Sequence, residues 1–578
     1  MDDLGNGTAG TGNGAGRGNA GDAHAATHAG NGANTTSAAH AARIDSTTRA
    51  STCDGRKPSR RATLITRRNV LLTAGVSLAA GAAAGAATAF ALPGGEAGGA
   101  PSETGMGAQG QAPGGQGGAD TMTFDYTGSY TGAIEASGED VTESNGSYAT
   151  TEADQVAALA QDGGTLALTA AQLTKTGDDT DGDRCNFYGV NSIATAVGEQ
   201  SAIYLDGCAL EATSEGSNGV FATNKATILV NDSSITTSAG NARGLDATYG
   251  GTVVAHKMTI STQGDHCAGV ATDRGGGSIS VTDSTIKTGG SGSPILYSTG
   301  DVQVSGITGT ATGSQLAGME GLNTILIKDC SLTSTVTGKT ASDPVANGVI
   351  IYQSTSGDAE STTGETATFQ VSDSTLTSAI ESGALLFLTN TAASIVLSNT
   401  ALDFDTGAAR LLYAAGNDAN SWGQAGSNGA TVTFTGRGQT LAGDISADTI
   451  SQVSVYLLDA SAWTGAAVIE ENSNGQAVDA PLTVNVDAAS AWVVTESCTV
   501  SALNVEDGGQ VVDESGAAVT IVAGGATVQS GCSVTVTVTG EYGTTVSAGD
   551  ETELKGSDDM IDRSAFDERF GTSTGWTM

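Results

Sequence analysis

Proline, aromatic side chains and positive charge are all scarce in this sequence. Its 578 residues include 7 Pro, aromatics account for 4%, and 23 Lys and Arg face 62 Asp and Glu, which gives a formal net charge of -39. Collagen needs abundant Pro with Gly at every third position, a coiled coil needs far more Glu, Lys and Leu, and nucleic-acid-binding proteins are normally basic. The composition excludes these three classes, although Gly is abundant at 83 residues.

The few basic residues are concentrated near the beginning of the chain. Nine of them lie in the first 68 positions, so that from residue 93 onward 14 basic residues face 57 acidic ones, a net charge of -43. A body this acidic repels nucleic acid and anionic membrane surfaces. We therefore expect partners among cations, neutral glycans and basic proteins, and no nucleic acid.

A targeting segment lies where the charge changes. Residues 66–72 (TRRNVLL) lead into an apolar, Ala- and Gly-rich stretch that ends at Ala89-Phe90-Ala91, a small-x-small cleavage site. Paired arginines before a weakly hydrophobic stretch resemble a twin-arginine export signal. The alternatives are an uncleaved membrane anchor, since about 22 apolar residues can span a bilayer, or no targeting role. A signal or an anchor places the rest of the chain outside the cytoplasm, so we expect an extracellular or cell-surface location.

The sequence divides into five parts. Residues 1–60 are low-complexity and predicted to be disordered, 61–92 are the signal or anchor, 93–120 form a Gly-rich linker, 121–540 form one repeat domain and 541–578 form a tail. The tail is predicted either to form a short helix that caps the open end of the repeat domain or to be disordered. The length alone would suggest about three or four domains, but a repeat grows without forming new cores.

A recurring pattern begins near residue 160. It consists of two apolar residues separated by one residue of any type, then a gap of four residues, then a third apolar residue. The i, i+2 spacing places two side chains on one face of a strand, and the gap, rich in Asp, Asn, Ser and Thr, is typical of a turn. Three apolar series recur at one constant step: Ile203, Ile228 and Val253; Leu210, Ile235 and Ile260; and Val220, Leu245, Val270 and Ile295. Two or three short strands in each repeat of about 25 residues predict an all-β fold, a right-handed parallel β-helix solenoid.

With these repeats the sequence resembles the pectate-lyase-like β-helix superfamily over roughly residues 140–530. Residues 492–511 (WVVTESCTVSALNVEDGGQV) are similar to the terminal coils of autotransporter passenger domains. In such a solenoid each strand pairs with the equivalent strand of the next coil about 4.8 Å away. Stacks of Ile, Val and Leu fill the narrow core and Gly occupies the corners, in agreement with the composition.

The cysteines suggest two different roles. Cys208 and Cys330 occupy a repeat position held elsewhere by Ser or Thr, and Cys267 also aligns with small residues, so these three are predicted to be buried free thiols. Cys498 and Cys532, one or two coils apart, are the predicted disulfide. No spacing of Cys or His in the chain is typical of a zinc site.

One cluster of acidic, basic and imidazole side chains is a candidate for catalysis. It combines Arg243, Asp246, Asp265, His266, Asp273 and Arg274 from two adjacent coils. Resemblance to β-helix polysaccharide hydrolases and lyases implies that such residues share one exposed sheet, where paired carboxylates act as acid and base or bind calcium beside an arginine base. The alternative is that they are solvated corner residues that pair with each other.

Two further features suggest ligand binding. Asp179, Asp181 and Asp183 alternate along an insertion with Gly182, a pattern that can direct oxygens at calcium; a solvated acidic loop is the alternative. Tyr413 and Trp422 are candidates for stacking on a sugar ring. Apart from calcium, no cofactor is expected.

These observations favour an exported or surface-displayed adhesin or glycan-binding rod without catalytic activity. Its expected partners are an extracellular glycan or a host or cell-surface protein, with no membrane contact beyond the possible N-terminal anchor. The first alternative is a polysaccharide lyase or glycoside hydrolase, which rests on fold analogy alone. The second is a purely structural surface protein.

Overall fold

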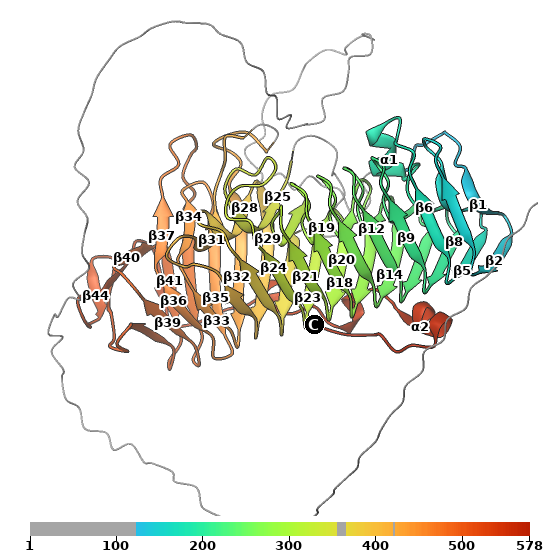
Figure 1. Cartoon of the computed structure of the whole chain (residues 1–578). Coiled ribbons are helices and arrows are strands. Elements are labelled where there is room, and N and C mark those ends of the chain that lie inside the picture. Colours follow the sequence, from blue (N-terminus) through green and yellow to red (C-terminus); the bar gives the residue numbers. More distant parts are fainter. Residues whose placement is uncertain (1–122, 355–365, 420–421) are drawn as a thin grey trace, which may run out of the picture. The chain divides into compact units, whose positions relative to one another are not determined.

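The computed structural model describes residues 123–354, 366–419 and 422–578. This part of the chain is a stack of coils built from three long sheets, here called sheets A, B and C, and two short ones, sheets D and E (Figure 1). Every pair of neighbouring strands in these sheets is parallel except β43 with β44. The predicted parallel β-helix is confirmed. The predicted signal or anchor and the Gly-rich linker lie outside the described residues.

Sheets A, B and C each receive one strand from a typical coil, in that order along the chain. Sheet A has 13 strands: β1 (Gly132–Ser137), β4 (Val156–Gln161), β7 (Ala194–Val197), β10 (Val220–Thr223), β13 (Leu245–Ala247), β16 (Val270–Thr272), β19 (Leu296–Ser298), β22 (Ala317–Glu320), β25 (Asn347–Tyr352), β28 (Ala384–Thr389), β31 (Arg410–Ala414), β34 (Ile445–Asp448) and β37 (Ala467–Glu470). Sheet B has 15: β2 (Asp140–Ser144), β5 (Thr165–Thr169), β8 (Ala202–Asp206), β11 (Thr227–Asn231), β14 (Gly251–His256), β17 (Gly277–Thr282), β20 (Asp301–Ser305), β23 (Thr324–Lys328), β26 (Ala367–Ser372), β29 (Thr391–Ser398), β32 (Ala430–Arg437), β35 (Gln452–Leu458), β38 (Leu482–Val486), β41 (Ala502–Val505) and β46 (Tyr542–Gly543).

The third side of the solenoid changes sheet along its length. Sheet C has 10 strands: β3 (Ser147–Thr150), β6 (Gln172–Lys175), β9 (Ala209–Ala212), β12 (Ser234–Thr237), β15 (Thr259–Thr262), β18 (Thr285–Thr288), β21 (Thr308–Ala311), β24 (Ser331–Ser334), β27 (Thr375–Ser378) and β30 (Ala401–Asp403). Sheet D continues with β33 (Thr440–Ala442), β36 (Ala462–Gly465), β39 (Ala491–Val494) and β42 (Gln510–Asp513). Sheet E contains β40 (Cys498–Val500), β45 (Thr535–Val538), β43 (Thr520–Ala523) and β44 (Ala526–Gln529). The helical elements are α1 (Gly182–Tyr188), η1 (Asp550–Thr552), η2 (Ser557–Asp559) and α2 (Ser564–Phe570).

The register of the sheets follows the predicted constant step in the regular coils. Ile228 lies opposite both Ile203 and Val253 in sheet B, as predicted. In sheet A the predicted series fails at its last member, because Val270 pairs with Leu296 and not with Ile295. The connection from β16 to β17 contains one more residue than the connection from β13 to β14, so the strands that follow are displaced by one position.

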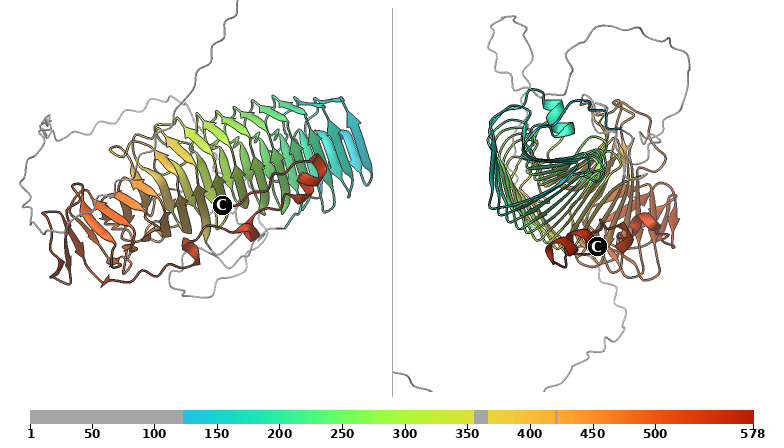
Figure 2. Two further views of the ribbon diagram at one scale, coloured as in Figure 1. Left: turned by 90° about the horizontal axis from the view of Figure 1, so that it is seen from below. Right: turned by 90° about the vertical axis from the view of Figure 1, so that its right-hand side faces the viewer.

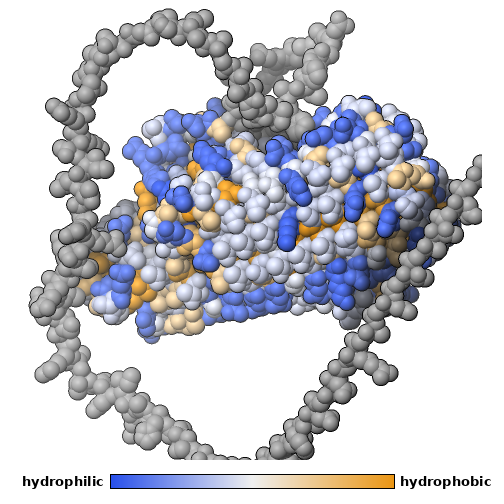
Figure 3. All heavy atoms as spheres, viewed as in Figure 1, coloured by the Kyte–Doolittle hydropathy of each residue, from blue (hydrophilic) through white to orange (hydrophobic). Residues whose placement is uncertain are grey.

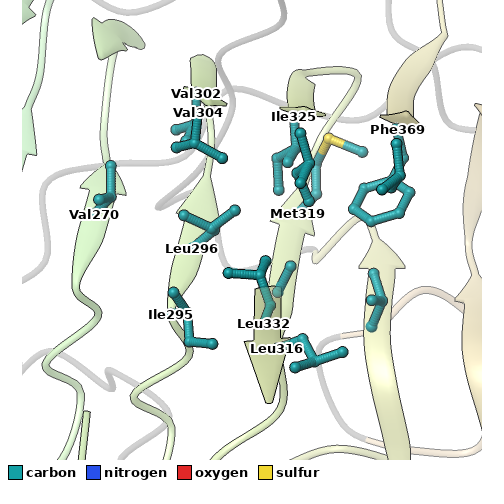
Figure 4. Close-up of a cluster of buried hydrophobic side chains, with 14 of the residues drawn as sticks. Val270, Ile295, Leu296, Val302, Val304, Leu316, Met319, Ile325, Leu332 and Phe369 are labelled. Atoms are coloured by element: carbon teal, nitrogen blue, oxygen red, sulfur yellow. The ribbon is translucent and has the colours of Figure 1, made fainter. Parts of the chain in front are cut away.

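The core is a column of aliphatic side chains inside the coils. In Figure 4, Val270, Leu296 and Met319 from sheet A face Val302, Ile325 and Phe369 from sheet B and Leu332 from sheet C. The core also contains aromatic rings: Trp463 and Trp492 stack with ring centroids 4.9 Å apart. Among the described residues Val528, at 45% exposed, is the large hydrophobic side chain that is exposed, and Figure 3 shows hydrophobic residues scattered over the face in view.

The turn between sheets B and C explains the repeated Ser, Thr and Cys. Its corner residue has positive φ in successive coils, as at Asp232 (46°) and Asp283 (49°), and the next residue points inward. There the side chain accepts a hydrogen bond from the backbone of the previous coil: Ser233 Oγ accepts from Cys208 N–H at 2.9 Å, and Ser374 Oγ from Cys330 N–H at 3.0 Å. Cys208, Cys267 and Cys330 are buried free thiols, as predicted.

The predicted disulfide between Cys498 and Cys532 is absent, and both residues are thiols in the structure. Cys498 lies in β40 and contacts the backbone of Ala467, whereas the thiol of Cys532 hydrogen-bonds the carboxylate of Asp513. Strand β40 pairs with β45 so that Cys498 lies opposite Val536, not opposite Cys532. The two sulfurs therefore face different neighbours.

The C-terminal tail was predicted either to cap the open end of the solenoid with a short helix or to be disordered. The structure shows that it does not cap the end. Sheet E, with its β43–β44 hairpin, forms the C-terminal end instead. Residues 549–574, here called the C-terminal strap, run back along the outer face of sheet B, where Ser394 Oγ donates to the carbonyl of Glu551 at 2.6 Å and Arg563 reaches Ser280 (Figure 2). Within the described residues no helix is long and apolar enough to cross a membrane.

Candidate functional site

The outer face of sheet A carries two columns of side chains set by strand register. The central column faces outward between the core-facing positions; from β10 to β34 it reads Phe221, Asp246, Ala271, Tyr297, Gly318, Ile350, Phe387, Tyr413 and Ser446. Two residues further along the chain in each coil lies a second column, which includes Asp273, just after β16, and Glu320, Tyr352, Asp448 and Glu470. Since parallel strands lie about 4.8 Å apart, members of neighbouring coils are in contact range.

Arg243 is the centre of the predicted cluster. Its Nη2 lies 2.9 Å from Asp273 Oδ2 and its Nε 3.7 Å from Asp246 Oδ2. Its Nη1 donates to Asn186 Oδ1 in α1 at 2.8 Å. Arg274 lies beside this group with its guanidinium 3.5 Å above the ring of Phe187 in α1. Four of the six predicted residues are thus assembled beneath α1.

Asp246 is the unusual member of the cluster. Its side chain is 0% exposed, and neither carboxylate oxygen has a hydrogen-bond partner within the described part of the chain. Burial raises the pKa of Asp246 well above its ordinary value, and the Arg243 guanidinium opposes this shift. A buried carboxyl group without donors favours its protonated form, because desolvation penalises the charge.

Asp265 and His266 lie at the corner before β16 and not on the strand face. Asp265 Oδ1 accepts a hydrogen bond from the Ser291 backbone at 2.8 Å, which ties two corners together. His266 has a φ of 57°. Burial lowers the pKa of His266, and Arg243 lowers it further. The structure thus places these two residues beside the cluster, in the corner role that was the alternative prediction.

The sequence pattern missed a second cluster further along the same face. Glu320 Oε2 accepts hydrogen bonds from the hydroxyls of Tyr297 at 2.9 Å and Tyr352 at 3.0 Å. Burial raises the pKa of all three groups. Tyr297 lies two coils after Asp246 in the central column. The sequence pattern missed this cluster because the coils that contain it do not keep the constant step of the earlier coils, so the strand register could not be counted from the sequence.

Aromatic rings extend the face toward the C-terminal coils. Trp422 stacks on Tyr352 with ring centroids 4.1 Å apart, and Tyr413 lies 5.8 Å from Phe387. The guanidinium of Arg410 lies 4.3 Å from the Tyr413 ring, whose hydroxyl donates to Glu470 at 3.1 Å. Burial raises the pKa of Tyr413 to about 12. Tyr413 and Trp422 contact different rings of sheet A: Trp422 stacks on Tyr352, whereas Tyr413 lies tilted against Phe387.

A further aromatic group lies near α1 at the other end of the face. Tyr188 and Tyr249 are parallel at 5.5 Å, and Tyr126 stacks on Tyr188 at 5.1 Å. Phe124 approaches both Tyr188 and Tyr249 edge-on at 5.5 Å. Tyr188 and Tyr249 lie close enough to Arg274 for its charge to act on their hydroxyls, and Tyr188 and Tyr126 are partly exposed.

The carboxylates predicted to bind calcium have separate contacts. Asp181 is the N-cap of α1 and also pairs with Arg184 at 3.0 Å. Asp179 hydrogen-bonds the thiol of Cys185. Among the residues that the structure describes, no three His, Cys, Asp or Glu side chains are grouped so as to hold a metal ion. Calcium binding by Asp179, Asp181 and Asp183 stays a prediction.

A buried ammonium group lies next to this acidic segment. Lys175 is 0% exposed, and its Nζ donates to the carbonyls of Glu152, at 2.8 Å, and Gly177. Burial lowers the pKa of Lys175, while the nearby carboxylates, including Asp178 and Asp179, raise it. The carboxylates thus act against the loss of charge that burial imposes on this ammonium group.

Comparison of the chain with protein-family models, with curated proteins and with solved structures finds no match. The structure itself defines the chain as a parallel β-helix. Because a fold alone does not determine function, only the residues of the site indicate what the chain does.

Proposed function

We propose that the chain is an exported or surface-displayed β-helix protein that binds an extracellular polysaccharide along the outer face of sheet A. The observation that carries the proposal is the alignment of aromatic rings and carboxylates from successive coils in two columns on that sheet. Flat rings stack on sugar rings, and fixed polar groups orient the hydroxyls around them. Export rests on residues 61–92 alone.

The outer faces of sheets B and C are less suited to binding a polysaccharide than that of sheet A. The outer face of sheet B is occupied by the chain's own C-terminal strap. Sheet C presents mainly small hydroxyl side chains, such as Thr259, Thr285 and Ser331, without aromatic rings between β9 and β30. Sheet A combines rings and charged groups, which is the combination that sugar recognition uses.

The charge of the chain limits the class of polysaccharide. On sheet A, Asp273 and Glu470 are paired with Arg243 and Arg410, so the repulsion of anions comes from the excess of carboxylates over the whole body, which from residue 93 has a net charge of -43. Like charges repel, so a polyuronic acid is disfavoured on this surface. We infer a neutral or amine-bearing polysaccharide as the ligand.

The test is the retention of the purified full chain on neutral, amine-bearing and acidic polysaccharides, each with and without calcium. Tyr352→Ala and Tyr413→Ala are expected to weaken binding at least ~10-fold, since stacked rings contribute on the order of 1 kcal/mol or more. Tyr456→Ala, which removes a partly buried ring from β35 in sheet B, is the matched control and is expected to bind as the unmodified chain. Failure to bind any polysaccharide, or equal losses in all three variants, would overturn the proposal.

The second candidate is a polysaccharide hydrolase or lyase, and one observation favours it. Asp246, whose pKa is raised by burial, lies beside Asp273, which forms an ion pair with Arg243. Two carboxyl groups in such different environments suit the acid and base roles of glycoside cleavage. New reducing ends or unsaturated products, lost in both Asp246→Asn and Asp273→Asn, would replace the binding proposal with this one. Binding without products would exclude it.

A further inference from the structure

The C-terminal strap contacts sheet B through a series of polar anchors. The anchors are Ser394 with Glu551 O, Arg437 with Thr552 O and the Glu553 carboxylate, Gln370 with Glu553 O and Lys555 N, Gln303 with Asp559 O and Ile561 N, and Arg563 with β14 and β17. The strap therefore crosses successive coils in the direction opposite to the chain (Figure 2). Its last anchor differs from the others because it is a buried charge.

Arg563 is 4% exposed and uses all three guanidinium nitrogens. Its Nη1 donates to Ser280 O at 3.0 Å and Ser280 Oγ at 2.8 Å, and its Nε donates to Thr574 Oγ1 at 2.8 Å. Its Nη2 donates to Ala255 O and to Thr282 Oγ1, both at 3.0 Å. Helix α2 begins directly after Arg563. The ring of Phe566 in this helix is 0% exposed and packs on Leu229 and Val254.

His256 shares one of these partners with Arg563. Thr282 Oγ1 lies 2.9 Å from His256 Nδ1 while it accepts from the arginine. An arginine can only donate, so the hydroxyl hydrogen remains for a neutral imidazole, which accepts it on Nδ1. A protonated imidazole instead directs a second N–H at the same oxygen and adds a second positive charge next to Arg563.

The groups that face His256 come from both sides of the strap contact. From the solenoid, Asp283 Oδ2 lies 3.5 Å from Nδ1, and Lys257 follows in the chain. From the strap come Arg563 and Asp567, and the ring of Phe566 lies 6.2 Å away. The two carboxylates favour the imidazolium form, but burial of the side chain, 6% exposed, and the two cations oppose it.

We propose that His256 is a pH-sensitive latch: its protonation releases α2 and the end of the C-terminal strap from sheet B and uncovers the apolar face of β11 and β14. Burial lowers the pKa of His256 in the docked state below its ordinary value of 6.5. A lowered pKa means that docking stabilises the neutral form. The stabilisation is complete above about pH 6.5 and is lost as the pH falls through the lowered pKa.

The rest of the strap provides an internal reference for the test. The anchors at Ser394 and Gln370 have no imidazole beside them, so residues 549–555 are expected to stay docked at the same pH. Asp567 does not titrate in this range, because its hydrogen bonds with Thr574 and Thr572 hold its pKa below 3.8 against the effect of burial. Release is therefore expected to be confined to the last part of the strap.

The experiment is hydrogen exchange of the full chain between pH 7.5 and 4.5, corrected for the intrinsic exchange rate and read by mass spectrometry. We expect peptides covering 562–574 to lose at least ~10-fold of their protection on acidification, while 549–555 and the strands keep theirs. His256→Gln, which cannot be protonated, is expected to remain protected at pH 4.5. His266→Gln is the matched control and is expected to release as the unmodified chain.

A second variant keeps the test informative if His256→Gln prevents docking at neutral pH. Asp283 is 66% exposed in its side chain, so Asp283→Asn leaves the packing intact. Asp283 belongs to the solenoid, so it stays beside His256 after α2 is released. Asp283→Asn therefore lowers the pKa of His256 in both the docked and the released state, and the release is expected to move to lower pH. Unchanged protection of 562–574 in the unmodified chain down to pH 4.5, or the same release midpoint with Asp283→Asn, would overturn the proposal.

Discussion

The guanidinium of Arg243 and the carboxylate of Asp273, which come from adjacent coils, form an ion pair of 2.9 Å on the outer face of sheet A. Both side chains are nearly buried, at 11% and 8% exposed. Arg243→Met is expected to lower the free energy of unfolding by about 3–5 kcal/mol, because it leaves Asp273 and Asp246 buried without their cation. Urea denaturation of the full chain measures this. Arg184→Met, whose partner Asp181 is exposed, is the control and is expected to cost less than about 1 kcal/mol. Equal losses in the two variants would contradict this account.

Cys330 links three coils through hydrogen bonds and not through a disulfide. Its sulfur accepts from the Ile307 N–H at 3.3 Å, while its own N–H donates to Ser374 Oγ. Cys330→Ser keeps an acceptor and is expected to leave the stability nearly unchanged. Cys330→Val leaves the Ile307 amide buried without a partner and is expected to cost about 1–3 kcal/mol. Thermal denaturation of both variants checks the difference, and identical melting temperatures would show that the sulfur only fills space.

Asp301 predicts a second pH dependence of the C-terminal strap, opposite in sign to that of His256. Its oxygens lie 3.1 and 2.9 Å from Gln303 Nε2, which also donates to the carbonyl of Asp559. Burial raises the pKa of Asp301 to about 7, and the Asp559 carboxylate adds to the shift. A raised pKa stabilises the docked state at low pH, and this stabilisation is lost as the pH rises through about 7.

Hydrogen exchange of residues 557–561 is expected to show weaker protection at pH 8 than at pH 6. Asp301→Asn is expected to remove this difference, whereas Asp329→Asn, at an exposed turn, is expected to keep it. Protection that stays constant between pH 6 and 8 in the unmodified chain would contradict the assignment.

The regular coils could be predicted because identical positions stack on themselves. Ile203, Ile228 and Val253 repeat at one spacing, and that spacing is the length of a coil. Arg243, Asp246 and Asp273 could be grouped in the same way, since they come from neighbouring coils of nearly equal length.

The cluster around Glu320 could not be predicted from the sequence because the later coils differ in length. Tyr297 pairs with Gly318, and Gly318 pairs with Ile350, so the second of these two steps along the chain is far longer than the first. The strap leaves no periodic signal at all: Arg563 and Ser280 are 283 residues apart in sequence, and only folding makes them neighbours. The disulfide prediction failed for the same reason, because it relied on sequence distance without strand register.

Hydrogen exchange of the full chain, with and without a polysaccharide that it retains, locates the binding face directly. Binding along sheet A predicts added protection at and beside the outward columns of β19, β22, β25, β28 and β31, and unchanged exchange in β18, β21 and β24 of sheet C. Protection confined to sheet C, or to residues of the C-terminal strap, would show that sheet A is not the binding face.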